Sequence, residues 1–173
     1  MNKWWMVAVA AALGAAPAAA QQDGPLSVSV GYAFAQYLEE GGGSAPLGVY
    51  VSLATPGKVA FDLDAAWHHD SEDVGDVSGR SLTVNTFTGG VGPRFNFGGG
   101  SARPFLHVLG GLRHDALGLG GEGVSNTSWG GMSGLGVDIG RGSVALRLGA
   151  DFQIFFEGGE SIKTLRLAAG VTF

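Results

Sequence analysis

The chain has 173 residues, 45% of them hydrophobic, with 32 glycines, no cysteine and a formal net charge of −5. This composition suits a single domain and excludes disulfide staples, thiol chemistry and cysteine-based metal sites. The negative charge argues against nucleic acid as a partner. Because apolar residues are plentiful and glycine follows no collagen period, the glycines indicate strands and tight turns rather than disorder.

The start of the chain has the character of a secretory signal peptide. A short basic segment with Lys3 precedes apolar residues 4–16, and small residues at 18–20 provide a cleavage site. The apolar run is too short and too interrupted to cross a membrane as a helix. We therefore expect residues 1–20 to be a cleaved signal peptide and residues 21–173 to form one mature domain.

Beyond this segment, apolar and polar residues alternate with the period of two that is typical of β-strands with one apolar face. The alternation is cleanest where Val59, Phe61 and Leu63 oppose Asp62 and Asp64. We expect eight strands, at residues 26–37, 47–53, 59–68, 82–97, 103–114, 129–139, 144–154 and 164–173.

The connections between these strands differ in length. Short turns are expected at residues 55–58, 98–101 and 140–143, after the second, fourth and sixth strands, and at Gly158-Gly159. Long loops are expected at Asp70–Arg80, which is acidic, and at Ala116–Thr127.

Two strands have an irregular alternation. In the fourth, Leu82 and Val84 fall on the polar phase, and a β-bulge near Gly89-Gly90 would reset it. In the fifth, the apolar Leu109 shares a face with His107 and Arg113, so the pattern does not settle which face is apolar.

The last strand decides the class of barrel. One apolar face runs to the final residue, and an open apolar edge of this kind would template aggregation in water. Closing the last strand onto the first removes the edge, and lipid requires such closure because it offers backbone groups no hydrogen bonds. We therefore expect an all-β, eight-stranded, antiparallel, up-and-down transmembrane β-barrel with both termini in the periplasm. The apolar face consists of Leu165, Leu167, Ala169, Val171 and Phe173.

Aromatic residues near the strand ends indicate two girdles at the membrane surfaces, where amphipathic rings meet headgroups. The expected girdle residues are Tyr37, Trp67, Trp129, Phe155 and Phe156 at the outer ends and Phe95, Phe97 and Phe173 at the inner ends.

Four features resemble those of the small outer-membrane β-barrel family, which includes outer membrane proteins A and X. They are the signal peptide, the eight alternating segments, Gly92-Pro93-Arg94-Phe95-Asn96-Phe97 before a glycine turn, and the terminal segment from Leu165 to Phe173. The resemblance covers the whole mature chain. It implies location in the outer membrane of a Gram-negative-type bacterium, lipid and lipopolysaccharide as surroundings, and insertion by the assembly machinery, with the apolar face of residues 165–173 as the recognition signal. The family implies no single activity, and we expect a monomer.

The inward phases of the strands carry charges of both signs, which must pair in a low-dielectric interior. A two-residue turn at Gly158-Gly159 places Asp151 opposite Arg166, so a salt bridge is expected there. A charged plug can fill and specify the core, or it can gate small ions. The expected network comprises Asp62, Asp64, Arg94, Arg113, Asp138, Arg147, Asp151 and Arg166.

The histidines raise the possibility of catalysis resembling that of lipid A deacylases. His68 and His69 point to opposite faces of a strand, which spoils a contiguous triad with Ser71, and His69 with Ser71 would fall into the acidic loop. That loop could hold a divalent cation, but its spacing is irregular. We expect no cofactor, no metal site and no enzymatic activity. The sequence favours a structural role in envelope integrity or surface-loop interaction, with a narrow pore and a deacylase as the alternatives.

Overall fold

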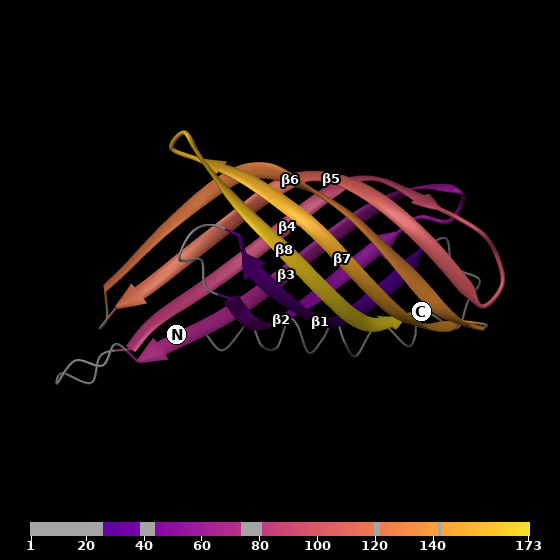
Figure 1. Cartoon of the computed structure of the whole chain (residues 1–173), viewed down its shortest axis with the longest axis horizontal. Coiled ribbons are helices and arrows are strands. Elements are labelled where there is room, and N and C mark those ends of the chain that lie inside the picture. Colours follow the sequence, from indigo (N-terminus) through magenta and orange to yellow (C-terminus); the bar gives the residue numbers. More distant parts are fainter. Residues whose placement is uncertain (1–25, 39–43, 74–80, 120–121, 142) are drawn as a thin grey trace.

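The computed structural model describes residues 26–38, 44–73, 81–119, 122–141 and 143–173. The expected signal peptide and the first residues of the expected mature domain lie outside this part of the chain. The described residues form one closed antiparallel barrel, in which each strand pairs with its neighbours in the sequence and the last pairs with the first (Figure 1). The strands are β1 (Ser27–Tyr37), β2 (Ser44–Ala54), β3 (Val59–Asp73), β4 (Ser81–Asn96), β5 (Ala102–Leu119), β6 (Glu122–Arg141), β7 (Val144–Glu157) and β8 (Glu160–Thr172).

The closure of the barrel confirms the fold expected from the last strand. β8 pairs with β7 on one side and with β1 on the other, in a continuous register from Ser29 opposite Thr172 to Tyr37 opposite Thr164. Reciprocal backbone hydrogen bonds of 3.1 and 2.8 Å between Val28 and Phe173 extend this pairing to the final residue. The terminal strand therefore has no free edge to expose.

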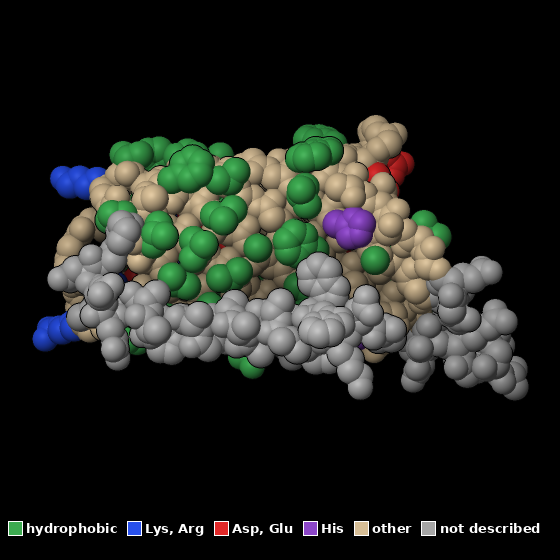
Figure 2. All heavy atoms as spheres, turned by 180° about the vertical axis from the view of Figure 1, so that it is seen from behind, with side chains coloured by type: hydrophobic (Ala, Val, Ile, Leu, Met, Phe, Trp, Pro, Cys, Tyr) green, Lys and Arg blue, Asp and Glu red, His purple; other side chains and the backbone are tan. Residues whose placement is uncertain are grey.

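The barrel is apolar outside and polar inside. Large apolar side chains on the outer wall are exposed, including Tyr32 and Val59, which are each 68% exposed, while carboxylates and guanidinium groups are buried in the lumen. Figure 2 shows hydrophobic side chains spread over the wall and Lys and Arg side chains at one end. This is the reverse of a water-soluble barrel and fits a wall in contact with lipid.

We distinguish the two ends of the barrel by the strand connections that lie at each, and call them the hairpin end and the terminal end. The hairpin end holds the connections β1–β2, β3–β4, β5–β6 and β7–β8, and the terminal end holds Phe173 and the connections β2–β3, β4–β5 and β6–β7. At the hairpin end, Gly158 and Gly159 have φ angles of 57° and 97°, a left-handed turn that glycine adopts without strain. The described residues contain no helix that is long and apolar enough to cross a membrane.

The expected bulge near Gly89-Gly90 is wrong. β4 pairs with β3 in one unbroken register through these glycines, and Leu82 and Val84 stay on the inward phase. The register shift lies instead between β1 and β2, at Ala33 and Ala35. Leu82 and Val84 therefore lie on the inward side of β4 although they are apolar.

The long loop expected at Ala116–Thr127 is also wrong. β5 and β6 pair without interruption from Ala102 opposite Ile139 to Leu119 opposite Glu122, so most of the segment is an extended hairpin. Likewise, β3 continues to Asp73, and its acidic residues 70–73 are strand rather than loop. Both segments were predicted to be loops because the alternation of apolar and polar residues changes phase there. The outward residues become polar, and in sequence a strand without an apolar outer face resembles a loop.

Candidate functional site: the charged lumen

Arg166 lies inside the lumen and is 1% exposed. Its Nη1 donates to Asp64 Oδ1 at 2.6 Å, and its Nε donates to Asp151 Oδ2 at 2.8 Å. Asp151 and Arg166 are direct cross-strand partners, the relationship that the two-residue glycine turn imposes. Asp64 belongs to β3, which is not a neighbour of β8. Arg166 therefore bridges the lumen as well as the wall.

His107 joins two carboxylates of this interior. Its Nδ1 lies 3.2 Å from Asp62 Oδ2, and its Nε2 lies 2.7 Å from Asp151 Oδ1. A neutral imidazole has one donor and one acceptor nitrogen, so it would set a lone pair against one of the carboxylates. When both carboxylates are ionised, only the imidazolium form satisfies both contacts, because it donates from both nitrogens. In that form His107 is a fourth cation beside the three buried arginines of the central lumen.

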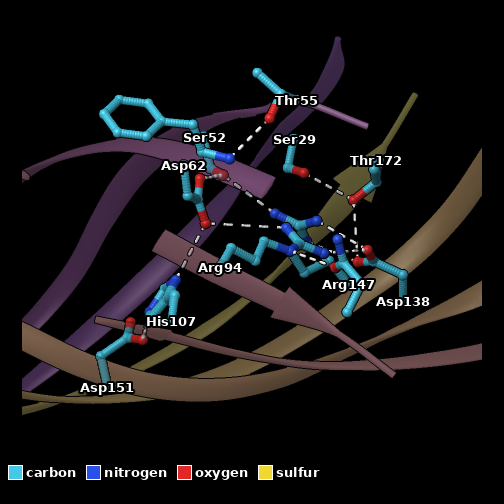
Figure 3. Close-up of polar contacts among 12 residues, drawn as sticks. Ser29, Ser52, Thr55, Asp62, Arg94, His107, Asp138, Arg147, Asp151 and Thr172 are labelled. Carbon is cyan, nitrogen blue, oxygen red and sulfur yellow. Dashed lines mark hydrogen bonds and ion pairs between the residues drawn. The ribbon is translucent and has the colours of Figure 1, made fainter. Parts of the chain in front are cut away.

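Asp138 accepts hydrogen bonds from two arginines. Arg147 donates to it from Nε at 2.7 Å and from Nη2 at 2.8 Å, and Arg94 donates from Nη2 at 3.0 Å (Figure 3). The two guanidinium groups also lie against the Phe105 ring, 3.8 and 4.8 Å from its centroid. The two hydrogen bonds from Arg147 to Asp138 fix the plane of its guanidinium group, and both guanidinium groups make cation–π interactions with the face of the ring.

Hydroxyl groups link these ion pairs into one network. Ser52 donates to Asp62 at 2.9 Å and accepts from Arg147 at 3.2 Å, while Thr172 donates to Asp138 at 3.3 Å and bonds to Ser29 at 2.8 Å. With Ser29 in β1 and Ser52 in β2, every one of the eight strands contributes a side chain. The interactions run across the lumen as well as around it, so side chains occupy its cross-section.

Gly134 leaves the space in which two members of the network meet. It is the direct partner of His107 on β5 and of Asp151 on β7. A Cβ atom at this position would overlap Asp151 Oδ1 and lie 2.7 Å from His107 Nε2. Only glycine therefore allows this approach without displacing a side chain.

A second polar cluster lies nearer the hairpin end. Arg113 donates to Asp115 from Nε at 2.6 Å and from Nη2 at 2.9 Å, and its Nη2 also reaches Tyr37 Oη at 3.2 Å. Thr86 donates to the same Asp115 at 2.5 Å. Arg113 is thus buried as expected but does not join the central network. Between the two clusters, Leu109, Met132 and Phe155 form an apolar layer.

Two of the expected girdle residues are wrong. Tyr37 lies on the inward phase and contacts Arg113, and Phe155 is 0% exposed inside the barrel. Both follow from strand parity: Phe155 and Phe156 are adjacent in β7, so only one can face lipid. The outward residues of the expected set are Trp67, Phe95, Phe97, Trp129 and Phe156, while Phe173 is half-buried.

The histidine pair does not form a triad. His68 is buried in the lumen, whereas His69 is exposed on the outer wall, stacks on Trp67 and hydrogen-bonds Asn85 at 2.9 Å. His69 and Ser71 lie in β3 rather than in a loop, contrary to expectation. No cluster of three metal-ligating side chains occurs in the described part of the chain.

Sequence reasoning missed Asp115 and the bridging role of His107. Asp115 follows Arg113 by two residues, so both share a face of β5, but the strand was expected to end at His114. Extending the alternation by one residue would have found it. The role of His107 depends on Asp62 and Asp151, which come from strands that are not its neighbours, and no local pattern reports such contacts.

The comparisons with known proteins agree with this architecture. A family model described as outer membrane protein beta-barrel domain matches residues 6–173. The fold is similar to the crystal structure of Neisserial surface protein A, with a TM-score of 0.66, 18% identity, and coverage of 86% of this chain and 96% of that one. No curated protein sequence matches the chain.

Two further solved structures share the fold. The Yersinia pestis attachment invasion locus protein Ail, in complex with the heparin analogue sucrose octasulfate, gives a TM-score of 0.62 at 17% identity and covers 86% of this chain and 97% of its own. Pseudomonas aeruginosa OprG gives 0.54 at 12% identity, with 85% and 93% covered. At these identities the likeness shows the fold, while the family match spans nearly the whole sequence. The chain belongs to the outer-membrane β-barrel family, and its strands cross the outer membrane.

Proposed function

We propose that this protein is a small structural outer-membrane barrel, closed by its charged lumen, that serves envelope integrity or surface-loop interaction. The observation that carries the proposal is the network around Arg166, in which ion pairs cross the lumen between strands that are not neighbours. A barrel of eight strands has just enough interior for side chains to fill it. Here the filling side chains are held by charge pairing, which favours a permanent plug over a path for solutes.

The same network restricts what could pass. Removing one partner of a buried ion pair typically costs about 3–5 kcal/mol because it leaves an uncompensated charge. An ion that entered would have to displace Arg166 or Arg147 from more than one partner each. This supports the closed barrel over the narrow pore, which is the alternative function.

Conductance across a planar lipid bilayer tests the closed barrel. We expect the wild-type protein to add no steady single-channel current. Arg166→Ala leaves Asp64 and Asp151 without their cation, so it should lower the melting temperature of the folded band in unboiled electrophoresis, and Lys163→Ala, which removes an exposed cation from the same strand, should not. A steady wild-type current that disappears or changes ion selectivity in Arg166→Ala would replace the structural function by the pore.

We propose no catalysis for this chain. His69 is paired with the amide of Asn85 rather than with an orienting carboxylate, and no hydrogen bond joins it to Ser71 among the described residues. A deacylase nucleophile requires both its base and the group that orients the base. Mass spectra of lipid A from cells with and without the protein should therefore be identical, and loss of an acyl chain would overturn this.

The proposal includes an orientation of the barrel in the membrane and a segment for its assembly. The hairpin end faces outward and both termini lie in the periplasm, as short periplasmic turns and longer outer hairpins favour. The outward face of β8, with Leu165, Leu167, Ala169 and Val171, and the final Phe173 are the segment we assign to recognition by the assembly machinery. The barrel works as a monomer without a cofactor, surrounded by lipid and lipopolysaccharide.

A further inference from the structure

The polarity of the sheet reverses at the hairpin end. Trp67 and Phe87 are cross-strand partners and both face outward. One row beyond them, the outward residues are His69, Asn85, Ala116 and Ser125, with a 2.9 Å hydrogen bond between His69 and Asn85. The outer surface has thus changed from apolar to polar. We call the strand segments beyond the Trp67–Phe87 pair, residues 68–73, 81–86, 115–119 and 122–126, the sheet extension.

The inner face of the sheet extension begins with a polar row, His68, Thr86, Asp115 and Asn126, and becomes mainly apolar in the next row. Asp70, Val84, Leu117 and Val124 form one row of successive cross-strand partners on the inward phase of β3, β4, β5 and β6. Leu82 lies two residues farther along β4 on the same face. Leu117 is 42% exposed and Val124 is 71% exposed. The three apolar residues of this row and Leu82 form what we call the mouth patch.

Neither the membrane nor the core accounts for the mouth patch. The lipid-facing wall is the opposite side of the same strands, and the buried clusters Leu109–Met132–Phe155 and Ala33–Tyr50–Ala66 do not include any of its residues. When both faces of a strand meet water, selection for solubility alone favours polar residues on each face. Apolar residues confined to the concave side point to an apolar ligand there.

The charged side chains at the mouth indicate which polar group the ligand carries. On the inward phase, the described mouth carries the guanidinium group of Arg113 and the carboxylates of Asp70, Asp115, Glu157 and Glu160. Arg113 is already paired with Asp115. Glu157 has only a long hydrogen bond of 3.4 Å from Ser128, and Asp70 has no ion pair or side-chain hydrogen bond within the described ranges. Among the described residues, Asp70 and Glu157 therefore have no cationic partner, and Asp70 lies beside an apolar surface.

We propose that the mouth patch binds a cationic amphiphile, a small molecule with an apolar body and an amine. The body packs on Val84, Leu117 and Val124, and the ammonium group lies beside the Asp70 carboxylate, which shares their row. An anionic or neutral molecule of the same shape lacks this charge complementarity. The site is separate from the charged lumen, so it can exist whether or not the lumen conducts ions.

The test uses full-length mature protein in nanodiscs of zwitterionic lipid, with dansylcadaverine as the amine and N-butyl dansylamide as its neutral analogue. We expect saturable dansyl fluorescence above that of empty nanodiscs for the amine, with weaker binding of the neutral analogue. Val124→Ser and Leu117→Ser should each weaken amine binding about tenfold, the effect of losing burial of one apolar side chain. Asp70→Asn should weaken binding of the amine and leave that of the neutral probe unchanged.

The outer face of the same hairpin supplies matched controls. Ala116→Ser and Ser125→Ala lie next to Leu117 and Val124 in sequence but on the opposite face, so they should leave binding unchanged. The electrophoretic shift between unboiled and boiled samples verifies folding of every variant. Absence of saturable amine binding, equal binding of both probes, or full binding by Val124→Ser in a folded barrel would each overturn the proposal.

Discussion

His107 Nε2 lies 2.7 Å from Asp151 Oδ1 directly over the backbone of Gly134, which separates the two residues in one cross-strand row. The row continues to Arg166 on β8 and to Arg94 on β4. This cross-strand row thus holds four ionisable residues from four strands, and His107 and Asp151 meet at its one position without a side chain. The contact between His107 and Asp151 depends on the space that Gly134 leaves. A substitution at Gly134 therefore tests the network without changing any charge.

Gly134→Ala should destabilise the barrel. The added methyl group would overlap Asp151 and His107, and overpacking of this kind typically costs about 1–3 kcal/mol. Urea titration in lipid vesicles, followed by tryptophan fluorescence, measures the loss. Gly110→Ala is the control, since a Cβ there meets nothing within 4 Å and should leave the midpoint unchanged. Equal midpoints for the two variants would show that the lumen accommodates the methyl group.

His107→Gln should also destabilise the barrel, because an amide can donate from one nitrogen only and carries no charge for Asp62 and Asp151. The expected loss is about 3 kcal/mol, the lower end for breaking a buried ion pair. Adding Asp62→Asn to this variant removes a carboxylate whose remaining cationic contact is Arg94 at 4.0 Å, and should restore part of the stability. The double-mutant cycle measures that coupling, and strictly additive losses would contradict the assigned contact.

Much of this arrangement could be predicted from local sequence patterns. Strand parity placed Asp151 and Arg166 on the inward face, and Gly158-Gly159 set their register, because both are local properties of the chain. The contact from Arg166 to Asp64 could not be predicted in the same way. It depends on the barrel radius and on which rotamers fill the lumen together, and these are properties of the closed barrel rather than of one hairpin.

The errors have two physical origins, and the first is the assumption that every aromatic near a strand end faces lipid. Phe155 broke that assumption because its neighbour Phe156 already occupies the outward phase of β7. The second origin lies in the extended β5–β6 hairpin, which was mistaken for a loop because its apolar side, Leu117 and Val124, faces inward. A change of phase along one strand is visible in the sequence only once the membrane boundary is known.

Phe155→Ala and Phe156→Ala should differ sharply although the residues are adjacent. Phe155 packs on Leu109 and Met132 inside the barrel, so its truncation leaves a cavity and should cost about 3–5 kcal/mol. Phe156 is 59% exposed on the outer wall and loses only lipid contact. Urea unfolding in vesicles compares them. If Phe156→Ala were the more destabilising, the inward assignment of Phe155 would be wrong.

Trp67 and Trp129 should both lie at the membrane surface near the hairpin end. They are exposed on the outer wall, 43% and 67% respectively, and the outward residues that follow Trp67 along β3 and precede Trp129 along β6 are polar. Aromatic rings with a polar N–H concentrate at the headgroup level, where one end is wet and the other apolar. The mature domain expected at residues 21–173 contains no other tryptophan, so its fluorescence reports this level alone.

Lipids brominated at different depths of the acyl chain measure that position. Bromine near the headgroup should quench tryptophan emission more strongly than bromine near the bilayer centre, for the mature protein and for Trp67→Phe, which retains only Trp129. Trp129→Phe tests Trp67 in the same way. Stronger quenching from the bilayer centre would move the membrane boundary outward beyond His69 and Asn85. The polar outer face of the sheet extension would then lie in hydrocarbon, where its hydroxyl, amide and imidazole groups are costly to bury. Stronger quenching near the headgroup places the mouth patch in water, where an amphiphilic ligand can reach it.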